Sequence, residues 1–203
     1  MGSDMERGAT AVLQGITRMR WGFPARLMAP LVHRMGPVRA LGWFLWNLPR
    51  YERLLARFGA VRVHLLATAI SLVNGCEYCG YGHGYALELT YLREHGTAFP
   101  LRRAELVELC GQPPATIRRR LMSAAQTAGL HGDAAWLDRA IELAANPELR
   151  PVDRDELAVA FLVRMFGVLN GVGIADATEP DHAHDAANKD GNLKQRLRAL
   201  SAA

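Results

Sequence analysis

Two cysteines and a histidine lie close together near the middle of the chain. Cys76 and Cys79 are three residues apart, and His83 follows Cys79 by four residues. Residues at these spacings share one face of an α-helix, so a helical segment brings the three side chains together. The thiolate is the reactive form of cysteine, and its pKa falls near a helix N-terminus and beside a histidine. The spacing therefore predicts a redox pair in which Cys79 is activated, Cys76 closes a disulfide with it, and His83 handles the thiol proton.

Three glycines occupy the same segment, at positions 80, 82 and 84. Each glycine in a helix interior costs about 0.5–1 kcal/mol relative to alanine. We therefore interpret them as sites of close packing or as an access path to the sulfurs. Two cysteines can also be plain core residues, but these glycines argue against that interpretation. Cys110 lacks such surroundings and is predicted to be a buried structural thiol.

The element before the motif is an apolar helix predicted over residues 60–73. Asn74 and Gly75 end it, because both residues tolerate the left-handed backbone angles of a helix C-terminus. A second helix, predicted over 76–95, then starts at the cysteines and packs against the first. A thioredoxin fold is disfavoured, because its cysteine pair follows a strand.

The rest of the chain shows helical spacing of apolar residues and almost no strand pattern. We predict an all-α protein with one compact multi-helix domain spanning residues 1–203. The remaining helices are expected near residues 9–19, 24–34, 37–47, 50–57, 101–110, 114–129, 133–145, 152–169 and 191–200. Asp133 and Asp153 are the expected N-caps of the helices that they precede. Residues 1–8 and about 174–192 are polar or without periodicity, so we expect them to be flexible.

Composition narrows the class of protein. The 203 residues include 24 basic and 20 acidic side chains, and half of the chain is apolar. This small basic excess does not favour nucleic-acid binding, and the run at 118–120 is interpreted as a solvated helix face. The apolar stretch at 27–48 is interrupted by charges and prolines, so no membrane span is expected. Three cysteines are too few for a disulfide framework, which favours a reducing, cytoplasmic location.

The stretch LLATAISLVNGCEYCGYGH resembles the signature of the alkylhydroperoxidase D and carboxymuconolactone-decarboxylase-like superfamily, in its peroxidase-related branch. In that superfamily an apolar helix ends just before C-x-x-C-x-x-x-H. The resemblance is sharp over residues 60–90 and extends more loosely over 152–173, where Phe166, Asn170 and Gly173 are similar to a late phenylalanine-asparagine segment.

The resemblance implies an all-helical fold of the alkylhydroperoxidase-D-like type and reduction of a small hydroperoxide without a bound cofactor. A disulfide oxidoreductase, which exchanges thiols and disulfides with an unknown partner, is the other function that we expect of the Cys76–Cys79 pair. The resemblance implies that Cys79 attacks the peroxide, that Cys76 resolves the product as a disulfide, and that His83 belongs to a proton relay. An external dithiol, thioredoxin-like or lipoyl-type, resets the pair. The resemblance also implies a homo-oligomer. The 41–48 segment also favours an oligomer, because it has more apolar surface than one small helix readily buries. Its apolar residues include Trp43, Phe44, Trp46 and Leu48.

One position departs from the family pattern. The superfamily usually has a glutamate twelve residues before the first cysteine, and this chain has His64 there. A histidine carries protons, and as an imidazolium it stabilises a nearby thiolate, but it does not supply the anionic partner that raises the basicity of His83. We therefore add His64 to the expected catalytic residues, as the group that tunes Cys79, and we expect peroxidase activity to depend on it.

A metal site is the alternative prediction. Zinc accepts a Cys2His2 ligand set, and the chain offers one in His64, Cys76, Cys79 and His83. If a metal binds there, the protein is a structural or interaction module without peroxidase activity. A second cluster, Asp181-His182-x-His184-Asp185, is interpreted as part of a solvated acidic tail.

Overall fold

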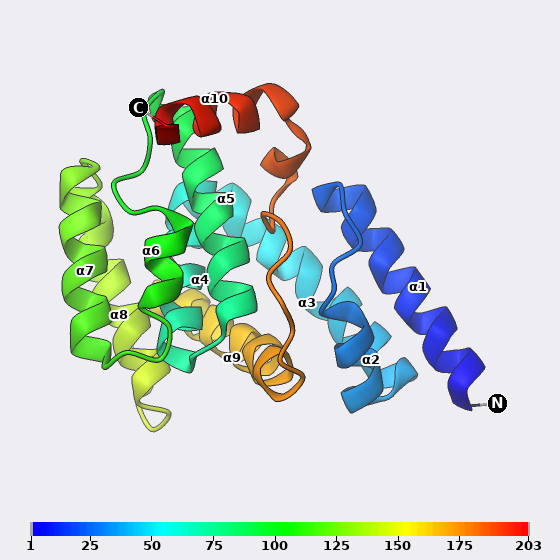
Figure 1. Cartoon of the computed structure of the whole chain (residues 1–203). Helices are drawn as coiled ribbons and strands as arrows, with labels where there is room; N and C mark the ends of the chain where they lie inside the picture. Colours follow the sequence, from blue (N-terminus) through cyan, green and yellow to red (C-terminus); the bar gives the residue numbers. More distant parts are fainter. Residues whose placement is uncertain (1, 203) are drawn as a thin grey trace.

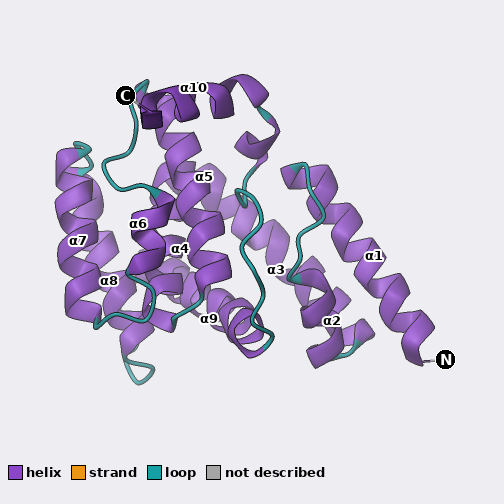
Figure 2. Ribbon diagram, viewed as in Figure 1, coloured by secondary structure: helices purple, strands orange, loops and turns teal. Residues whose placement is uncertain are grey.

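The computed structural model describes residues 2–202, and every regular element within them is a helix (Figures 1 and 2). The α-helices are α1 (Gly2–Trp21), α2 (Met28–Met35), α3 (Pro37–Phe58), α4 (Ala60–Asn74), α5 (Glu77–His95), α6 (Arg103–Glu108), α7 (Pro114–Thr127), α8 (Ala134–Ala145), α9 (Arg154–Ala175) and α10 (Gly191–Ala202). Two short 3-10 helices are η1 (His131–Asp133) and η2 (Ala186–Lys189). The expected all-α class is confirmed.

Helix α4 is the central element. It contacts α3, α5, α7, α8 and α9, and buried residues lie on all of its faces. A helix that is apolar all round is a core helix, since no face is left for water. Its end is the one predicted, because Gly75 adopts left-handed angles (φ 80°, ψ 24°) that close the last turn.

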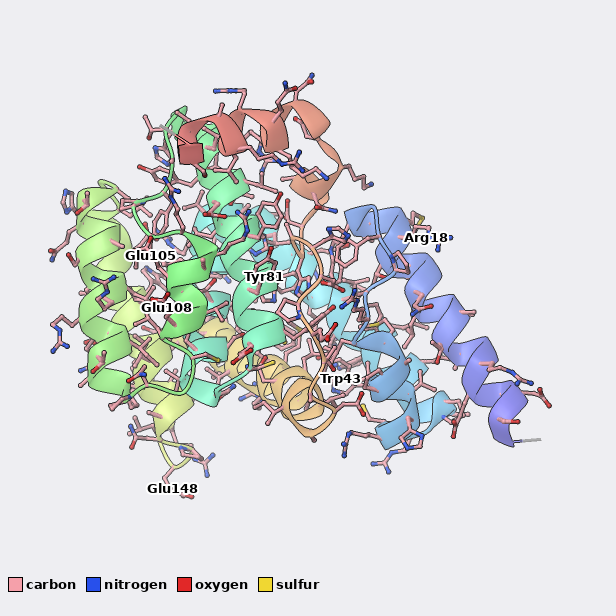
Figure 3. All side chains as sticks on the ribbon, in the orientation of Figure 1. Arg18, Trp43, Tyr81, Glu105, Glu108 and Glu148 are labelled. Atoms are coloured by element: carbon pink, nitrogen blue, oxygen red, sulfur yellow. The ribbon has the colours of Figure 1, made fainter. Side chains whose placement is uncertain are left out.

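Two apolar clusters meet near the start of α5. The larger one joins α4 to α7, α8 and α9, and the smaller one joins α1, α2 and α3. Cys76, Tyr78 and Cys79 belong to the smaller cluster, so the three N-terminal helices cover the thiol pair. Figure 3 shows the side chains between these ribbons, with Trp43 of α3 labelled.

The N-terminal half differs from the sequence prediction at one proline. We expected separate helices at 37–47 and 50–57, but α3 continues through Pro49. A proline inside a helix costs about 3 kcal/mol because it removes a hydrogen bond and crowds the preceding turn. Phe44 and Tyr51, on either side of Pro49, are both buried, and this packing holds the two halves in one helix. Residues 2–8 also belong to a helix, α1.

The segment after α9 packs into the protein. Residues 176–190, which we call the strap, run between α5 and the N-terminal helices towards α10, in orange in Figure 1. The backbone N–H of His184 donates to the Gly82 carbonyl at 3.1 Å, and Asn188 Nδ2 donates to the Trp21 carbonyl at 2.8 Å. The interpretation as a solvated tail is therefore wrong for the middle of the strap. Several polar side chains of the strap have their own partners in the protein, and such individual contacts produce no periodic pattern in the sequence.

The two expected caps have different outcomes. The Asp153 carboxylate accepts the N–H groups of Asp155 and Glu156, each at 2.8 Å, and caps α9 as predicted. Asp133 makes no such cap, because its carboxylate pairs with Arg62 of α4 instead. This ion pair links η1 to the central helix.

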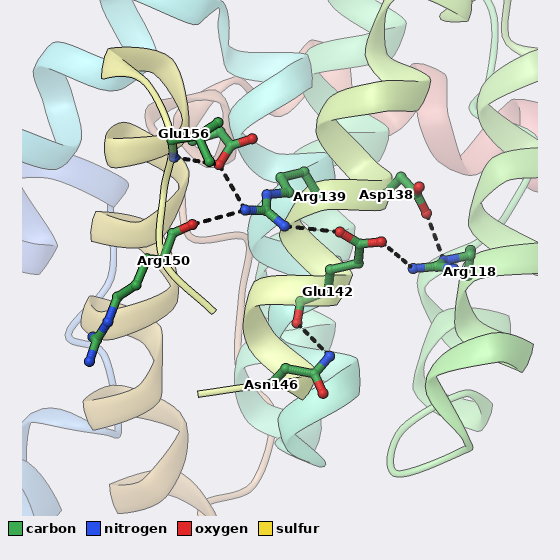
Figure 4. A network of polar contacts seen from close by, with 8 residues as sticks. Arg118, Asp138, Arg139, Glu142, Asn146, Arg150 and Glu156 are labelled. Atoms are coloured by element: carbon green, nitrogen blue, oxygen red, sulfur yellow. Dashed lines mark hydrogen bonds and ion pairs between the residues drawn. The ribbon is translucent and has the colours of Figure 1, made fainter. Parts of the chain in front are cut away.

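A polar network joins the outer helices. Arg139 of α8 pairs with Glu156 of α9 at 2.9 Å, and Arg118 of α7 pairs with Asp138 of α8 at 2.7 Å (Figure 4). The partly exposed Arg139 also donates to the Arg150 carbonyl at 3.0 Å, which fixes the loop before α9. This network lies away from the cysteines and serves the scaffold.

Among the described residues, α9 is long and apolar enough to cross a membrane by length and composition alone. A buried core helix passes the same test, and 44% of this stretch is buried inside the protein. Its contacts with α4, α5 and α8 account for its apolar character. The finding is therefore weak evidence for a membrane span.

Candidate active site

The thiol pair lies at the start of α5. Cys76 is the N-cap residue, with extended backbone (φ −96°, ψ 102°), and its Sγ accepts the N–H of Cys79 at 3.4 Å. Both thiols are free and buried, with 1% and 2% of their surfaces exposed. Gly173 of α9 lies against the first sulfur, since a Cβ added there would be 2.9 Å from Cys76 Sγ. The late glycine of the resemblance thus makes room for the first cysteine.

The two thiols differ in acidity, in the opposite sense to the sequence prediction. A hydrogen bond from the Cys79 thiol lowers the pKa of Cys76, with support from backbone N–H groups of the first helical turn. Burial raises the pKa of Cys79 well above its usual value, and the neighbouring Cys76 raises it further. The expected activation of Cys79 by the helix N-terminus is therefore wrong, because Cys76 occupies that position.

A chain of three polar groups lies behind the cysteines. His83 Nδ1 is 3.3 Å from His64 Nδ1, and His64 Nε2 is 3.1 Å from Asp185 Oδ2. All three side chains are buried, and His64 is fully enclosed. His64 thus lies between His83, which lines the cavity with Cys79, and the carboxylate of Asp185.

The charges along this chain follow from burial. Burial lowers the pKa of His83 well below its usual value, and the nearby His184 and His64 lower it further. His83 is therefore a neutral imidazole near pH 7 and is able to accept a proton. Burial alone would raise the pKa of Asp185, but the hydrogen bond and charge of His64 outweigh it and hold the pKa at about 2. Asp185 is ionised, so it can balance a positive charge on the imidazoles.

Cys79 and His83 line one enclosed cavity of about 50 Å³. A space of this size holds a few water-sized groups, which suits the reactive end of a small molecule. Apolar side chains form most of the wall, namely Trp21, Leu27, Met28, Trp43, Phe44, Leu48, Met165, Phe166 and Leu169. The polar groups are confined to the side of α5 and the strap, apart from Asn47 and Tyr51 on α3. The arrangement separates an apolar binding wall from a reactive wall.

Tyrosines have different roles around this cavity. The Tyr51 hydroxyl is buried and has no hydrogen-bond partner among the described residues. Burial, with a contribution from Asp185, raises the pKa of Tyr51 well above its usual value, so the phenol stays protonated. Tyr78 lines the cavity and donates to Asp181 Oδ2 at 3.0 Å. Tyr81, labelled in Figure 3, and Tyr85 instead pack beside the strap and α10.

The strap adds two residues that sequence reasoning assigned to a solvated tail. His184 lines the cavity, and its Nε2 is 3.3 Å from Asp181 Oδ1. Gly82 makes this position possible, because a Cβ there would lie 2.3 Å from the imidazole. Gly84 makes room for Leu106 in the same way, so close packing explains these two glycines. The sequence does contain a signal for this site. Asp181 and Asp185 flank His184, and Gly82 leaves the space that the His184 ring occupies.

The described residues do not support the zinc alternative. No group of three or more His, Cys, Asp or Glu side chains among residues 2–202 is arranged to hold a metal ion. The two sulfurs contact each other, and His64 is occupied by Asp185 and His83. The four candidate ligands do not converge on one point.

Cys110 lies apart from this chemistry. It is partly buried, and burial raises its pKa to about 11, so it stays a thiol at neutral pH. This agrees with the prediction of a structural cysteine.

Comparison of the chain with protein-family models, with curated proteins and with solved structures found no match.

Proposed function

We propose that the protein is a thiol-dependent hydroperoxide reductase that uses the Cys76–Cys79 pair. One observation carries the proposal: Cys79 and the proton-accepting His83 line the same enclosed cavity, while the Cys76 sulfur lies within hydrogen-bond distance of the Cys79 N–H. A nucleophile, a base and a resolving thiol are thus together at one small-molecule site.

The chemical steps follow from this placement. The Cys79 thiol gives its proton to neutral His83, and the ionised Asp185, which contacts the neighbouring His64, supplies the negative charge that balances it. The thiolate attacks one peroxide oxygen, the O–O bond breaks, and Cys79 becomes a sulfenic acid while an alcohol leaves. Cys76 then displaces water from the sulfenic acid and forms the disulfide. An external dithiol reduces this disulfide and is itself oxidised.

Burial favours a small substrate over a protein substrate. Both sulfurs are almost fully enclosed, so a disulfide on the surface of another protein has no direct path to them. This favours peroxide reduction over general protein disulfide exchange. It also favours a reductant with a slender dithiol arm, such as a lipoyl group, over a thioredoxin-like protein.

The roles of the two cysteines are tested with a sulfenic-acid probe and mass spectrometry. Cys79→Ser should abolish peroxide consumption, and Cys76→Ser should leave a sulfenic acid that the probe traps on Cys79. Cys110→Ser is the matched control and should behave as the parent protein, since this thiol is outside the cavity. Peroxide turnover preserved in Cys79→Ser, with the probe on Cys76, would reverse the assignment.

A further inference from the structure

We propose that His184, held by Asp181 of the strap, is a second catalytic residue, which protonates the leaving oxygen of the peroxide. This inference rests on the proposed function and adds a residue outside the Cys-x-x-Cys-x-x-x-His motif. It divides acid and base work between two histidines: His83 removes the proton from Cys79, and His184 delivers a proton to the departing alkoxide.

The placement of His184 supports a role in chemistry. Its ring is buried and lines the cavity that Cys79 and His83 also line. The ring centroids of His184 and His83 are 5.2 Å apart and nearly perpendicular, and Tyr78 is 4.9 Å away. The two imidazoles are therefore in edge contact, and both face the cavity that Cys79 lines.

Asp181 gives His184 the partner that a general acid needs. One carboxylate oxygen lies 3.3 Å from His184 Nε2, and the other accepts the Tyr78 hydroxyl and the Arg26 N–H, each at 3.0 Å. These contacts fix the carboxylate, and they hold its pKa below the usual value although burial alone would raise it. An ionised, fixed carboxylate orients the imidazole and balances the charge of its protonated form.

The surroundings of His184 are otherwise built to hold it in place. Trp21 stacks on the ring at 5.4 Å, and the Gly82 carbonyl binds the His184 backbone N–H. The titratable groups that face the ring are Asp181 on the strap and Tyr78 and His83 on α5. Gly82 lacks the side-chain atom that would exclude the imidazole.

The proposed step balances as follows. Two electrons pass from the Cys79 sulfur into the O–O bond, so a sulfur–oxygen bond forms as the oxygen–oxygen bond breaks. The attacked oxygen keeps its hydrogen and becomes the sulfenic acid. The leaving alkoxide takes the proton of His184 and departs as the alcohol. His83 holds the proton of the original thiol, and its return to His184 restores the starting state.

Two oxidants with different leaving groups test the acid. tert-Butyl hydroperoxide releases an alkoxide, which needs a proton, whereas peracetic acid releases acetate, which does not. Reduced protein is mixed with each oxidant, and the oxidation rate is followed by tryptophan fluorescence. We expect His184→Gln to slow oxidation by tert-butyl hydroperoxide on the order of 100-fold, the usual contribution of a general acid. Oxidation by peracetic acid should keep the parent rate.

The matched control is His182→Gln, which removes an exposed imidazole from the same strap and should leave both rates unchanged. Asp181→Asn keeps the shape of the carboxylate and should show the same selective loss, so the test stands even if His184→Gln does not fold. Equal slowing with both oxidants, or no slowing with either, would overturn the role of His184. A parent protein that neither oxidant oxidises would overturn the proposed function itself.

Discussion

A buried carboxylate lies two imidazoles away from the cavity that Cys79 lines. Asp185 contacts His64, and His64 contacts His83, so the negative charge lies two rings away from the cavity. A glutamate in place of His64, as the superfamily usually has, would bring the charge one ring closer. In this protein the series of contacts has one more ring, and the carboxylate belongs to the strap. Its effect on His83 therefore depends on how the strap folds.

The contact of Asp185 with His64, which is an ion pair when His64 is protonated, makes stability depend on pH. Its pKa of about 2 lies below the ordinary 3.8, so the native state favours the ionised carboxylate. This contributes about 2 kcal/mol of stability above pH 4, and the contribution is lost as the pH falls from about 4 towards about 2. We expect Asp185→Asn to be less stable than the parent at pH 6, with a difference that shrinks at pH 3.

Urea unfolding at both pH values measures this difference. The control is Asp176→Asn, at a more exposed carboxylate near the start of the strap, and its stability should follow the parent at each pH. A constant gap between Asp185→Asn and the parent from pH 6 to pH 3 would contradict the ion pair.

A glutamate at position 64 should destabilise this protein. His64→Glu would bury a second carboxylate beside Asp185, and two such groups cannot both ionise at low cost. One carboxyl then has a raised pKa, so stability is present at low pH and is lost as the pH rises through that value. Adding Asp185→Asn to His64→Glu removes the repulsion and should recover stability at pH 8. Thermal unfolding at pH 5 and pH 8 tests this, with His64→Gln as the uncharged control. Equal behaviour of the single and double variants would show that residues 64 and 185 do not interact.

At the scale of elements, the strap and α5 fit together through one missing side chain. The imidazole of His184 occupies the space where a Cβ of Gly82 would lie, at 2.3 Å. Gly82→Ala should therefore displace the strap and lower the free energy of unfolding by about 1–3 kcal/mol, the usual penalty of overpacking.

Gly167→Ala is the control: Gly167 is also inside a helix, but nothing lies within 4 Å of its added Cβ. That variant should gain about 0.5–1 kcal/mol from helix propensity alone. Denaturant unfolding of both variants measures the contrast, and two variants of equal stability would exclude the close fit.

The helices and the strap differ in how far the sequence predicts them. The apolar run of α4 and the Asn74-Gly75 stop are local signals, and both were predicted correctly. Pro49 is a local signal too, but packing of α3 overrides it. The role of Asp185 was not predicted because its partner lies 121 residues away, and no local pattern records such a contact. Likewise, Cys79 was expected to be acidic because spacing shows the helix start but not which sulfur accepts the hydrogen bonds of the first turn.

At the scale of the whole molecule, α3 presents apolar side chains that the rest of the described chain does not cover. In the 41–48 segment Phe44 is buried, but Leu45 and Trp46 of α3 are 56% and 65% exposed. This exposure continues to favour a homo-oligomer, although Arg50 covers part of the Trp46 ring at 3.6 Å. Exposed apolar side chains of this size on one helix are typical of a surface that meets another protein.

The oligomer should therefore depend on α3 and not on other exposed apolar residues. Trp46→Glu places a charge in the expected interface and should shift the protein towards a monomer of 22.3 kDa without unfolding it, since the side chain is exposed in the single chain. Val152→Glu is the matched control, because Val152 is 79% exposed in the loop before α9. Light scattering over a dilution series from micromolar concentration measures the mass of the parent and of both variants. A parent that is already a monomer at every concentration would contradict the expected assembly, and equal dissociation of both variants would place the interface elsewhere.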